Sequence, residues 1–275
     1  MNNPLNKFFR QPKIFITLPT RGKYCIPGVV EAVEELEVYG MTGADEIILK
    51  TPDALFNGFS ITKIIESCIP KIKNAFELSA TDIEMLLIAI RIASNGNTLT
   101  LTNICECGTE EDYQIKLDSM IDYFVNCKFI EEVTIPNNLV VKLKPITYKD
   151  ATNFSIEGYK FQKQMSHILN LTDELQQQKL MSELYNSIDE QQKSMLLKSI
   201  SAIYIVSENT VVTDSNYINE WLSNVEAETT DLINEVIKEN KKTWDMPPQK
   251  AICSNPECKK EHMLSVKLDN SFFFG

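Results

Sequence analysis

The chain has 275 residues, enough for one or two domains with a sizeable core. Hydrophobic residues make up 43% and charged residues 24%, as in an ordinary globular protein. The 27 Lys and Arg against 38 Asp and Glu give a net charge of −11, which argues against the phosphate backbone of a nucleic acid as main partner and favours protein partners.

The sequence contains no pattern typical of a secretory signal or a membrane span. Its strongest apolar run, 83–93, is interrupted by Glu84 and Arg91 and is shorter than the ~20 residues that a span requires. Without a signal, the seven cysteines are expected to be reduced thiols or metal ligands rather than disulfides. Three of them have no paired spacing and predict no chemistry: Cys25, Cys68 and Cys127.

Alternation and capping residues predict mixed secondary structure in the first half of the chain. We expect strands over 13–18 and 35–39, a helix that Thr42 begins, helices over 52–56, 60–68 and 83–94, and a strand over 98–102. The helix over 83–94 is so densely apolar that we expect it to be buried on most sides.

The second half is predicted to be mainly helical after one β-hairpin. We expect a helical turn over 120–125, a hairpin over 133–143, and helices over 147–169, 177–184, 190–206, 214–225 and 229–241. The pattern Ser187 to Glu190 resembles a capping box and predicts the start of the helix over 190–206.

These elements predict an α+β fold in three parts. Residues 1–40 are expected to form an N-terminal β-hairpin arm. Residues 41–147 together with 248–275 are expected to form an α+β domain, and residues 148–247 a large all-helical insert.

Two short cysteine motifs lie far apart in the sequence but share one register. Cys105 and Cys107 precede the strand-like Ile115–Asp118, and Cys253 and Cys258 precede the similar Val266–Asp269. From the second cysteine of each motif to the end of the strand-like segment, the two motifs are separated by the same interval (258 − 107 = 269 − 118 = 151). We interpret this as a repeated unit of knuckle, turn and strand, that is, a split zinc ribbon that brings the C-terminal segment back to the middle of the chain.

Two thiolate pairs on two turns are the ligands that a tetrahedral structural Zn²⁺ site requires, so Cys105, Cys107, Cys253 and Cys258 are the predicted ligands. The spacing departs from the usual two intervening residues, with one in the first pair and four in the second. Two alternatives stay open. His262 replaces a cysteine of the second pair, or the four cysteines are buried free thiols.

The sequence offers little that predicts catalysis. It has two histidines, His167 and His262, and it lacks the phosphate-binding loop, the nucleophile elbow and the paired-histidine zinc motif of hydrolases. We therefore expect no enzyme, no small-molecule substrate and no membrane partner.

Several blocks resemble a family of phage tail proteins. They are Ile16–Tyr24, Glu37–Thr42, Leu55–Gly58, Ser67–Pro70, Leu86–Arg91, the Cys-x-Cys-Gly knuckle and the ending Asp269–Gly275. Together they are similar to the T-even-type phage baseplate hub subunit and hub-assembly family, over about 14–118 and again over 250–275.

The resemblance implies a non-enzymatic component of the contractile tail that acts at the baseplate hub through protein–protein contacts. Its implied partners are other hub, tail tube or tape-measure proteins, and its implied location is the virion baseplate, or the host cytoplasm during assembly. A hub or tape-measure chaperone absent from the finished virion is one alternative. A zinc-ribbon protein associated with nucleic acid is another. We also expect the edges of the N-terminal arm, or Phe272–Phe274, to contact a partner.

Overall fold

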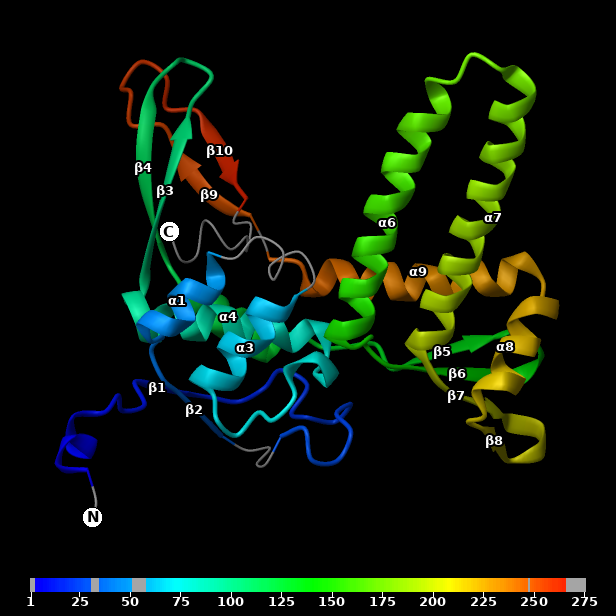
Figure 1. The fold of residues 1–275 in the computed structure, drawn as a ribbon, viewed down its shortest axis with the longest axis horizontal. Helices are drawn as coiled ribbons and strands as arrows, with labels where there is room; N and C mark the ends of the chain where they lie inside the picture. Colours follow the sequence, from blue (N-terminus) through cyan, green and yellow to red (C-terminus); the bar gives the residue numbers. More distant parts are fainter. Residues whose placement is uncertain (1–2, 31–34, 51–57, 247, 266–275) are drawn as a thin grey trace. The chain divides into compact units, whose positions relative to one another are not determined.

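The computed structural model describes residues 3–30, 35–50, 58–246 and 248–265 (Figure 1). The chain divides into two compact units: unit 1 comprises 1–127 and 243–275, and unit 2 comprises 128–242. Both contain helices and small antiparallel sheets, which confirms the predicted α+β class. The predictions for 52–56, Val266–Asp269 and Phe272–Phe274 lie outside the described residues.

Unit 1 is built around one buried helix, α4 (Ala80–Asn95), as the density of its apolar residues predicted. The Ser79 hydroxyl caps its first turn by accepting from the Thr81 N–H. Nine of its residues are buried, and α3, α5 and the β1–β2 sheet contact it. Gly40 passes so close that an added Cβ would lie 2.9 Å from the Ala93 carbonyl oxygen, which explains the small residue there.

The other elements of unit 1 are short. In chain order they are η1 (Pro4–Phe8), β1 (Ile14–Ile16), β2 (Leu36–Val38), α1 (Gly43–Leu49), α3 (Phe59–Cys68), η2 (Ala75–Glu77), β3 (Thr98–Ile104), β4 (Glu110–Lys116), α5 (Asp118–Asn126), β9 (Gln249–Ile252) and β10 (Glu261–Leu264). Strands β1 and β2 pair antiparallel, as predicted for the first part of the chain. Thr42 begins α1 in a capping box with Asp45, which confirms the predicted helix start.

Two β-hairpins of unit 1 carry the cysteine motifs. Strands β3 and β4 pair from Thr98 opposite Lys116 to Ile104 opposite Glu110, and β9 and β10 pair from Ile252 opposite Glu261 to Gln249 opposite Leu264. Strand β10 begins 151 positions after β4 (261 − 110), the interval that separates the sequence motifs. Each motif is therefore the connection between two antiparallel strands.

Unit 2 combines one four-stranded antiparallel sheet with four helices. Its elements are β5 (Glu132–Ile135), η3 (Pro136–Asn138), β6 (Leu139–Leu143), α6 (Tyr148–Leu169), α7 (Glu174–Ser199), β7 (Ile200–Ile205), η4 (Val206–Glu208), β8 (Thr210–Val212), α8 (Ser215–Asn224) and α9 (Ala227–Trp244), whose last residues belong to unit 1. The strand order is β5-β6-β7-β8, and α6 and α7 form an antiparallel hairpin between β6 and β7 (Figure 1).

The core of unit 2 lies between the sheet and helices α7, α8 and α9. Its buried members are Ile135, Val141, Leu143, Leu196, Ile200, Ile203, Ile218, Leu222 and Ile233. Apolar side chains that recur at intervals of three and four residues along α6 and α7 lie between the two helices, half-buried or buried. Gln191 adds a hydrogen bond to the Phe154 carbonyl oxygen at 3.0 Å across this pair.

Two predictions for the helical insert were wrong in detail. The helices expected over 177–184 and 190–206 are not separate, because the single helix α7 runs through both up to Ser199. Within α7 the Ser187 hydroxyl donates to the Glu183 carbonyl oxygen at 3.0 Å and does not cap a new helix. The segment 148–247 is also not all-helical, because α7 ends at Ser199 and strands β7 and β8 follow. The run from Ile200 to Ile205 is rich in β-branched and aromatic residues, which pair with β6 in the sheet.

Across the described part of the chain, we find no helix with the length and apolarity needed to cross a bilayer.

Candidate metal centre

The first cysteine pair lies on the tight connection between β3 and β4. Gly108 N–H donates to the Cys105 carbonyl oxygen at 2.8 Å, and Cys105 N–H donates to the Thr109 carbonyl oxygen at 2.9 Å. Gly108 adopts φ = +86°, a conformation that residues with a Cβ disfavour. The glycine therefore permits the turn that brings two cysteines separated by one residue to one site.

The second pair lies on the longer connection between β9 and β10. Cys253 N–H donates to the Lys260 carbonyl oxygen and Cys258 N–H donates to the Asn255 carbonyl oxygen, both at 3.0 Å. These bonds fold the four intervening residues into a compact loop. The wider spacing thus still presents both sulfur atoms on the same side.

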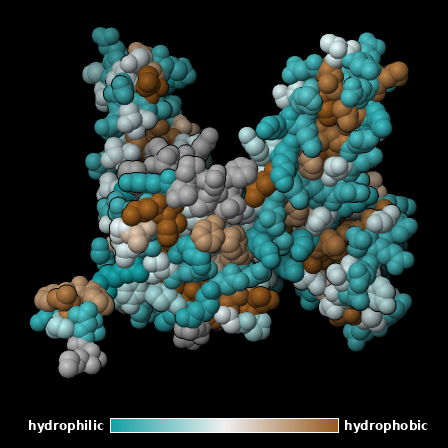
Figure 2. All heavy atoms as spheres, in the orientation of Figure 1, coloured by the Kyte–Doolittle hydropathy of each residue, from teal (hydrophilic) through white to brown (hydrophobic). Residues whose placement is uncertain are grey.

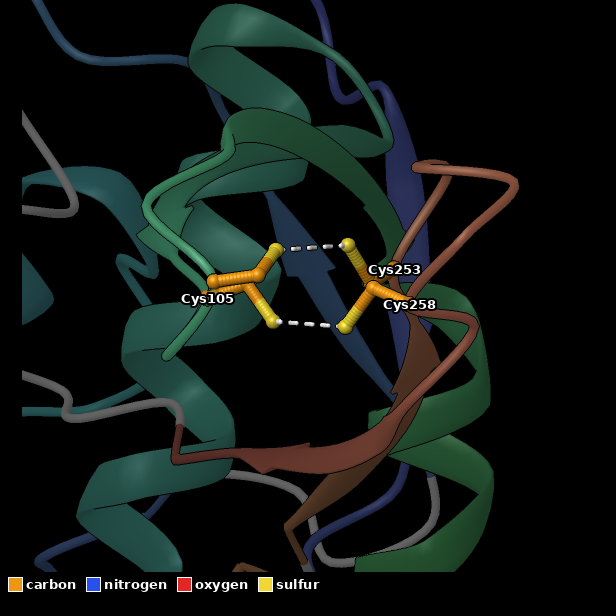
Figure 3. Close-up of side chains that lie close together, drawn as sticks. Cys105, Cys253 and Cys258 are labelled. Carbon is orange, nitrogen blue, oxygen red and sulfur yellow. Dashed lines mark hydrogen bonds between the residues drawn. The ribbon is translucent and has the colours of Figure 1, made fainter.

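The four sulfur atoms of these pairs converge (Figure 3). Cys105 Sγ lies 3.8 Å from Cys258 Sγ, and Cys107 Sγ lies 3.7 Å from Cys253 Sγ. All four Sγ atoms lie within 4.8 Å of one another, so they could hold one metal ion. Each close pair takes one sulfur from each hairpin, so a bound ion would join segments that are about 150 residues apart.

Burial differs among the four thiols. Cys105 and Cys253 are buried, Cys258 is half-buried and Cys107 is exposed. The Thr109 hydroxyl, 3.2 Å from Cys107 Sγ, lowers the pKa of that thiol to about 6, whereas burial raises the pKa of Cys253 to about 12. In the absence of a cation Cys253 therefore keeps its proton, and binding a divalent metal would release it.

His262 lies beside the cluster, but its side chain is hydrogen-bonded to Tyr113. Its Nε2 lies 2.9 Å from the Tyr113 hydroxyl, and the two rings meet edge to face. Among the described residues, the group of side chains that could hold a metal consists of the four cysteines and does not include His262. The arrangement therefore favours the four-cysteine set over the alternative in which His262 replaces one of them.

A polar network links the two hairpins around the sulfur atoms. The Glu111 carboxylate accepts hydrogen bonds from the Ser254 N–H at 2.6 Å, from the Ser254 hydroxyl and from the Tyr113 hydroxyl. The bond from Ser254 is the main reason that the pKa of Glu111 is lowered, so the carboxylate stays charged. Lys260 of the second hairpin also forms an ion pair with Glu106 of the first.

Sequence reasoning missed this network. Glu111 and Tyr113 alternate along β4, a signal that could have placed both on one face of the strand. Nothing in the local sequence pairs them with Ser254 and His262, because those contacts require the two hairpins to lie together. The three unpaired cysteines, Cys25, Cys68 and Cys127, lie outside the cluster.

The fold and the site together define an α+β protein in which a four-cysteine cluster joins two β-hairpins from distant parts of the chain. A protein-family model described as T4 bacteriophage base plate protein matches residues 50–274. The match covers most of the chain, and the chain therefore belongs to this family of phage baseplate proteins. No curated protein sequence and no solved structure shows significant similarity to the chain.

Proposed function

We propose that this chain is a non-enzymatic structural or assembly component of the baseplate hub of a contractile phage tail. Membership in the base plate family supports a place in the tail. The net charge of −11 supports partners that are proteins, and we propose hub, tail tube or tape-measure proteins as the class of partner.

We further infer that Cys105, Cys107, Cys253 and Cys258 hold a structural Zn²⁺. With Zn–S bonds of about 2.3 Å, neighbouring sulfur atoms of a tetrahedral site lie about 3.8 Å apart. Two sulfur pairs that join the hairpins, at 3.7 and 3.8 Å, match this separation. This agreement is the observation that carries the assignment of zinc.

The proposed zinc has a structural role, because four cysteine ligands leave no coordination position for a substrate or water. Zinc sites of this kind contribute about 10–16 kcal/mol in small peptides, comparable to the ~5–15 kcal/mol that stabilises a whole domain. A zinc ion at this position would therefore dominate the association of the two hairpins.

A role in nucleic-acid binding is less well supported. A zinc ribbon that contacts phosphates requires cations free to face them. Near the cluster, Lys260 pairs with Glu106, and Lys250 pairs with Glu261 at 2.7 Å. These pairs neutralise two lysines of the second hairpin, and Lys259 by itself does not form a basic stripe.

The proposed role is tested by deleting the gene for this chain from its phage and supplying it again from a plasmid. We expect the deletion to stop hub assembly and the plasmid to restore it, as judged by electron microscopy of tails. Mass spectrometry then separates two forms of the proposal: the chain in finished particles indicates a hub subunit, whereas the chain in assembly intermediates alone indicates a chaperone. Complete, infective tails in the deletion mutant would contradict both forms.

A further inference from the structure

The first described segment of the chain presents large apolar side chains to solvent. In residues 3–9, here called the apolar arm, Leu5 is 59% exposed, Phe8 73% and Phe9 57%. Figure 2 shows apolar residues gathered at the surface of this segment, beside the N-terminal end of the trace. Single exposed apolar residues are common, but three within five positions form a patch of the kind that marks an interaction site.

The apolar arm has its own local structure. The Asn3 side chain accepts from the Leu5 N–H at 3.0 Å, Pro4 occupies the first turn of η1, and the Phe9 N–H donates to the Asn6 carbonyl oxygen at 3.1 Å. Among the described residues, the hydrogen bonds of the apolar arm run within it or to neighbouring Gln11. The arm is therefore a short, capped helical turn, and more than half of the surface of each of its three large apolar side chains is exposed.

Arg10 fixes the base of the apolar arm to unit 1. Its guanidinium donates to the Gly40 carbonyl oxygen at 2.8 Å and to the Ser67 carbonyl oxygen at 2.7 Å, and lies 3.6 Å from the buried Asp45 carboxylate. An anchored turn has less conformational freedom to lose than a flexible tail when it binds a partner. The anchor therefore favours docking of a preformed segment.

The charge around the apolar arm is opposite to that of the rest of the chain. Residues 1–30 contain five Lys and Arg and no Asp or Glu. The other residues therefore contain 22 Lys and Arg against 38 Asp and Glu, a net charge of −16 (22 − 38). An apolar segment within a purely basic stretch complements an apolar groove with an acidic rim.

An apolar groove in unit 2 does not fit the arm. Between α6 and α7 lies a cavity of about 580 Å³, large enough for a small ligand or several side chains. Its lining includes the cations Lys160 and Lys163 and the acid Glu183, so its rim carries an excess of positive charge. This rim would repel Lys7 and Arg10, so a second copy of the chain does not offer the complementary groove here.

We propose that residues 3–9 dock as a preformed helical turn into an acidic-rimmed apolar groove on a different protein, a neighbouring component of the baseplate. Leu5, Phe8 and Phe9 fill the groove, and Lys7 pairs with its rim. The mode is that of a short amphipathic helix in a groove. This inference rests on the proposed function for the class of partner, but the surface itself is defined by exposure and charge.

The test measures binding of the purified full-length chain to hub intermediates isolated from cells infected with phage that lack this chain. The variant combines Phe8→Ala with Phe9→Ala, and its matched control combines Tyr185→Ala with Tyr217→Ala, two aromatic residues of unit 2 that are 58% and 65% exposed. We expect at least a tenfold loss of affinity in the variant and little change in the control, because buried aromatic anchors dominate interface energies. Thermal unfolding verifies that both keep the wild-type fold.

A charge reversal gives a second, independent measure. Lys7→Glu should weaken binding by several-fold and reduce its dependence on salt, whereas Lys179→Glu, at an exposed position of α7, should not.

Other results would overturn the proposal. Equal affinity of the wild type and the Phe8→Ala, Phe9→Ala variant would remove the arm from the interface and leave the proposed function intact. Failure of the wild type to bind the intermediates would count against both. If the wild type dimerises and the double variant does not, the arm binds a second copy of the chain instead. If the wild type binds phosphatidylglycerol vesicles and the double variant does not, the arm binds a membrane instead.

Discussion

At the residue scale, Asp82 is a carboxylate buried in the first turn of α4. Its side chain accepts hydrogen bonds from the Thr20 N–H at 3.0 Å and from the Thr20 hydroxyl at 2.6 Å, and it is fully buried. Burial raises the pKa of Asp82 to about 6 from an ordinary value of 3.8, and the two bonds from Thr20 oppose this rise. Asp82 therefore links the turn after β1 to α4, and its contribution to the free energy of unfolding depends on pH.

The raised pKa predicts the sign of a pH effect on stability. Between about pH 4 and pH 6 the folded chain holds a proton on Asp82 that the unfolded chain has lost, so the free energy of unfolding falls as pH rises. Asp82→Asn removes this dependence. The stability of the wild type relative to Asp82→Asn should fall by roughly 3 kcal/mol across the interval, at about 1.4 kcal/mol for each unit of pKa.

Chemical unfolding at a series of pH values measures this difference. Asp122→Asn, at an exposed position of α5, is the control, and its stability relative to the wild type should stay nearly constant. A wild-type advantage over Asp82→Asn that is flat, or that grows with pH, would contradict the assignment.

Also at the residue scale, each cysteine of the cluster is expected to be needed for metal binding. Purified wild type should contain one zinc per chain by elemental analysis. Cys253→Ala should weaken zinc affinity at least about a hundredfold, because ~10–16 kcal/mol is shared among four ligands. Cys25→Ala, which removes a thiol outside the cluster, should retain full zinc content. A metal-free wild type, or a Cys253→Ala variant that binds zinc normally, would exclude the proposed site.

At the scale of elements, local sequence signals predicted most helices and strands and failed where long-range packing decides. Thr42 and Asp214 were expected to begin helices and do so, because a cap is satisfied within four residues. Ser187 has the same signature, but it lies on a helix that pairs with α6 along an apolar seam, and this packing continues the helix through it.

In the candidate site, too, local sequence signals predicted one part of the structure and long-range packing decides the rest. The spacing and register of the cysteines predicted which thiols converge, because each motif is a local turn. The pairing of Cys105 with Cys258 and of Cys107 with Cys253 depends on how the two hairpins approach each other. The contacts of Glu111 with Ser254 depend on it too, and no local pattern contains that information.

Helix α9 is expected to be essential for the stability of unit 2. Ile233 is fully buried in the cluster that joins α9 to the sheet. Ile233→Ala should lower the free energy of unfolding of unit 2 by about 2–5 kcal/mol, as large-to-small changes in a core do. Trp221, which packs against this core, reports the transition by fluorescence in a Trp244→Phe background.

The matched control for Ile233→Ala is Val211→Ala, on strand β8, where the side chain is 54% exposed. It should change the transition little. If both substitutions cost the same, α9 would not be part of the core of unit 2.

At the scale of the whole molecule, unit 2 is inserted into unit 1. The chain leaves unit 1 after residue 127, completes unit 2 and returns at residue 243, and the returning hairpin β9–β10 meets β3–β4 at the cysteine cluster. Packing of Trp244 on Phe124, with ring centroids 6.3 Å apart, also holds the returning segment in unit 1. The Tyr123 hydroxyl also donates to the Thr243 carbonyl oxygen at 2.8 Å. The closure of unit 1 therefore combines apolar contacts, hydrogen bonds and the proposed metal.

Removal of the metal should loosen this closure and leave unit 2 unchanged. Solvent screens the exposed pair of Lys260 with Glu106, and the solvent-accessible Glu111 carboxylate exchanges its hydrogen bonds with water, so both contribute little beside the ~10–16 kcal/mol of a structural zinc. Treatment with a chelator should therefore speed amide hydrogen exchange in β9 and β10 many-fold. Amides that join β6 to β7 should exchange as before.

Mass spectrometry of the exchanged protein measures both regions in one sample, so unit 2 is an internal control for general unfolding. Added zinc should restore the slow exchange of β9 and β10, and Cys253→Ala should exchange rapidly there without any chelator. Unchanged exchange in β9 and β10 after metal removal would mean that the protein's own contacts, among them the polar network and the contact of Trp244 with Phe124, close unit 1 without a metal. Faster exchange in β6 and β7 would show instead that the two units are energetically coupled, because amide exchange follows cooperative units of structure.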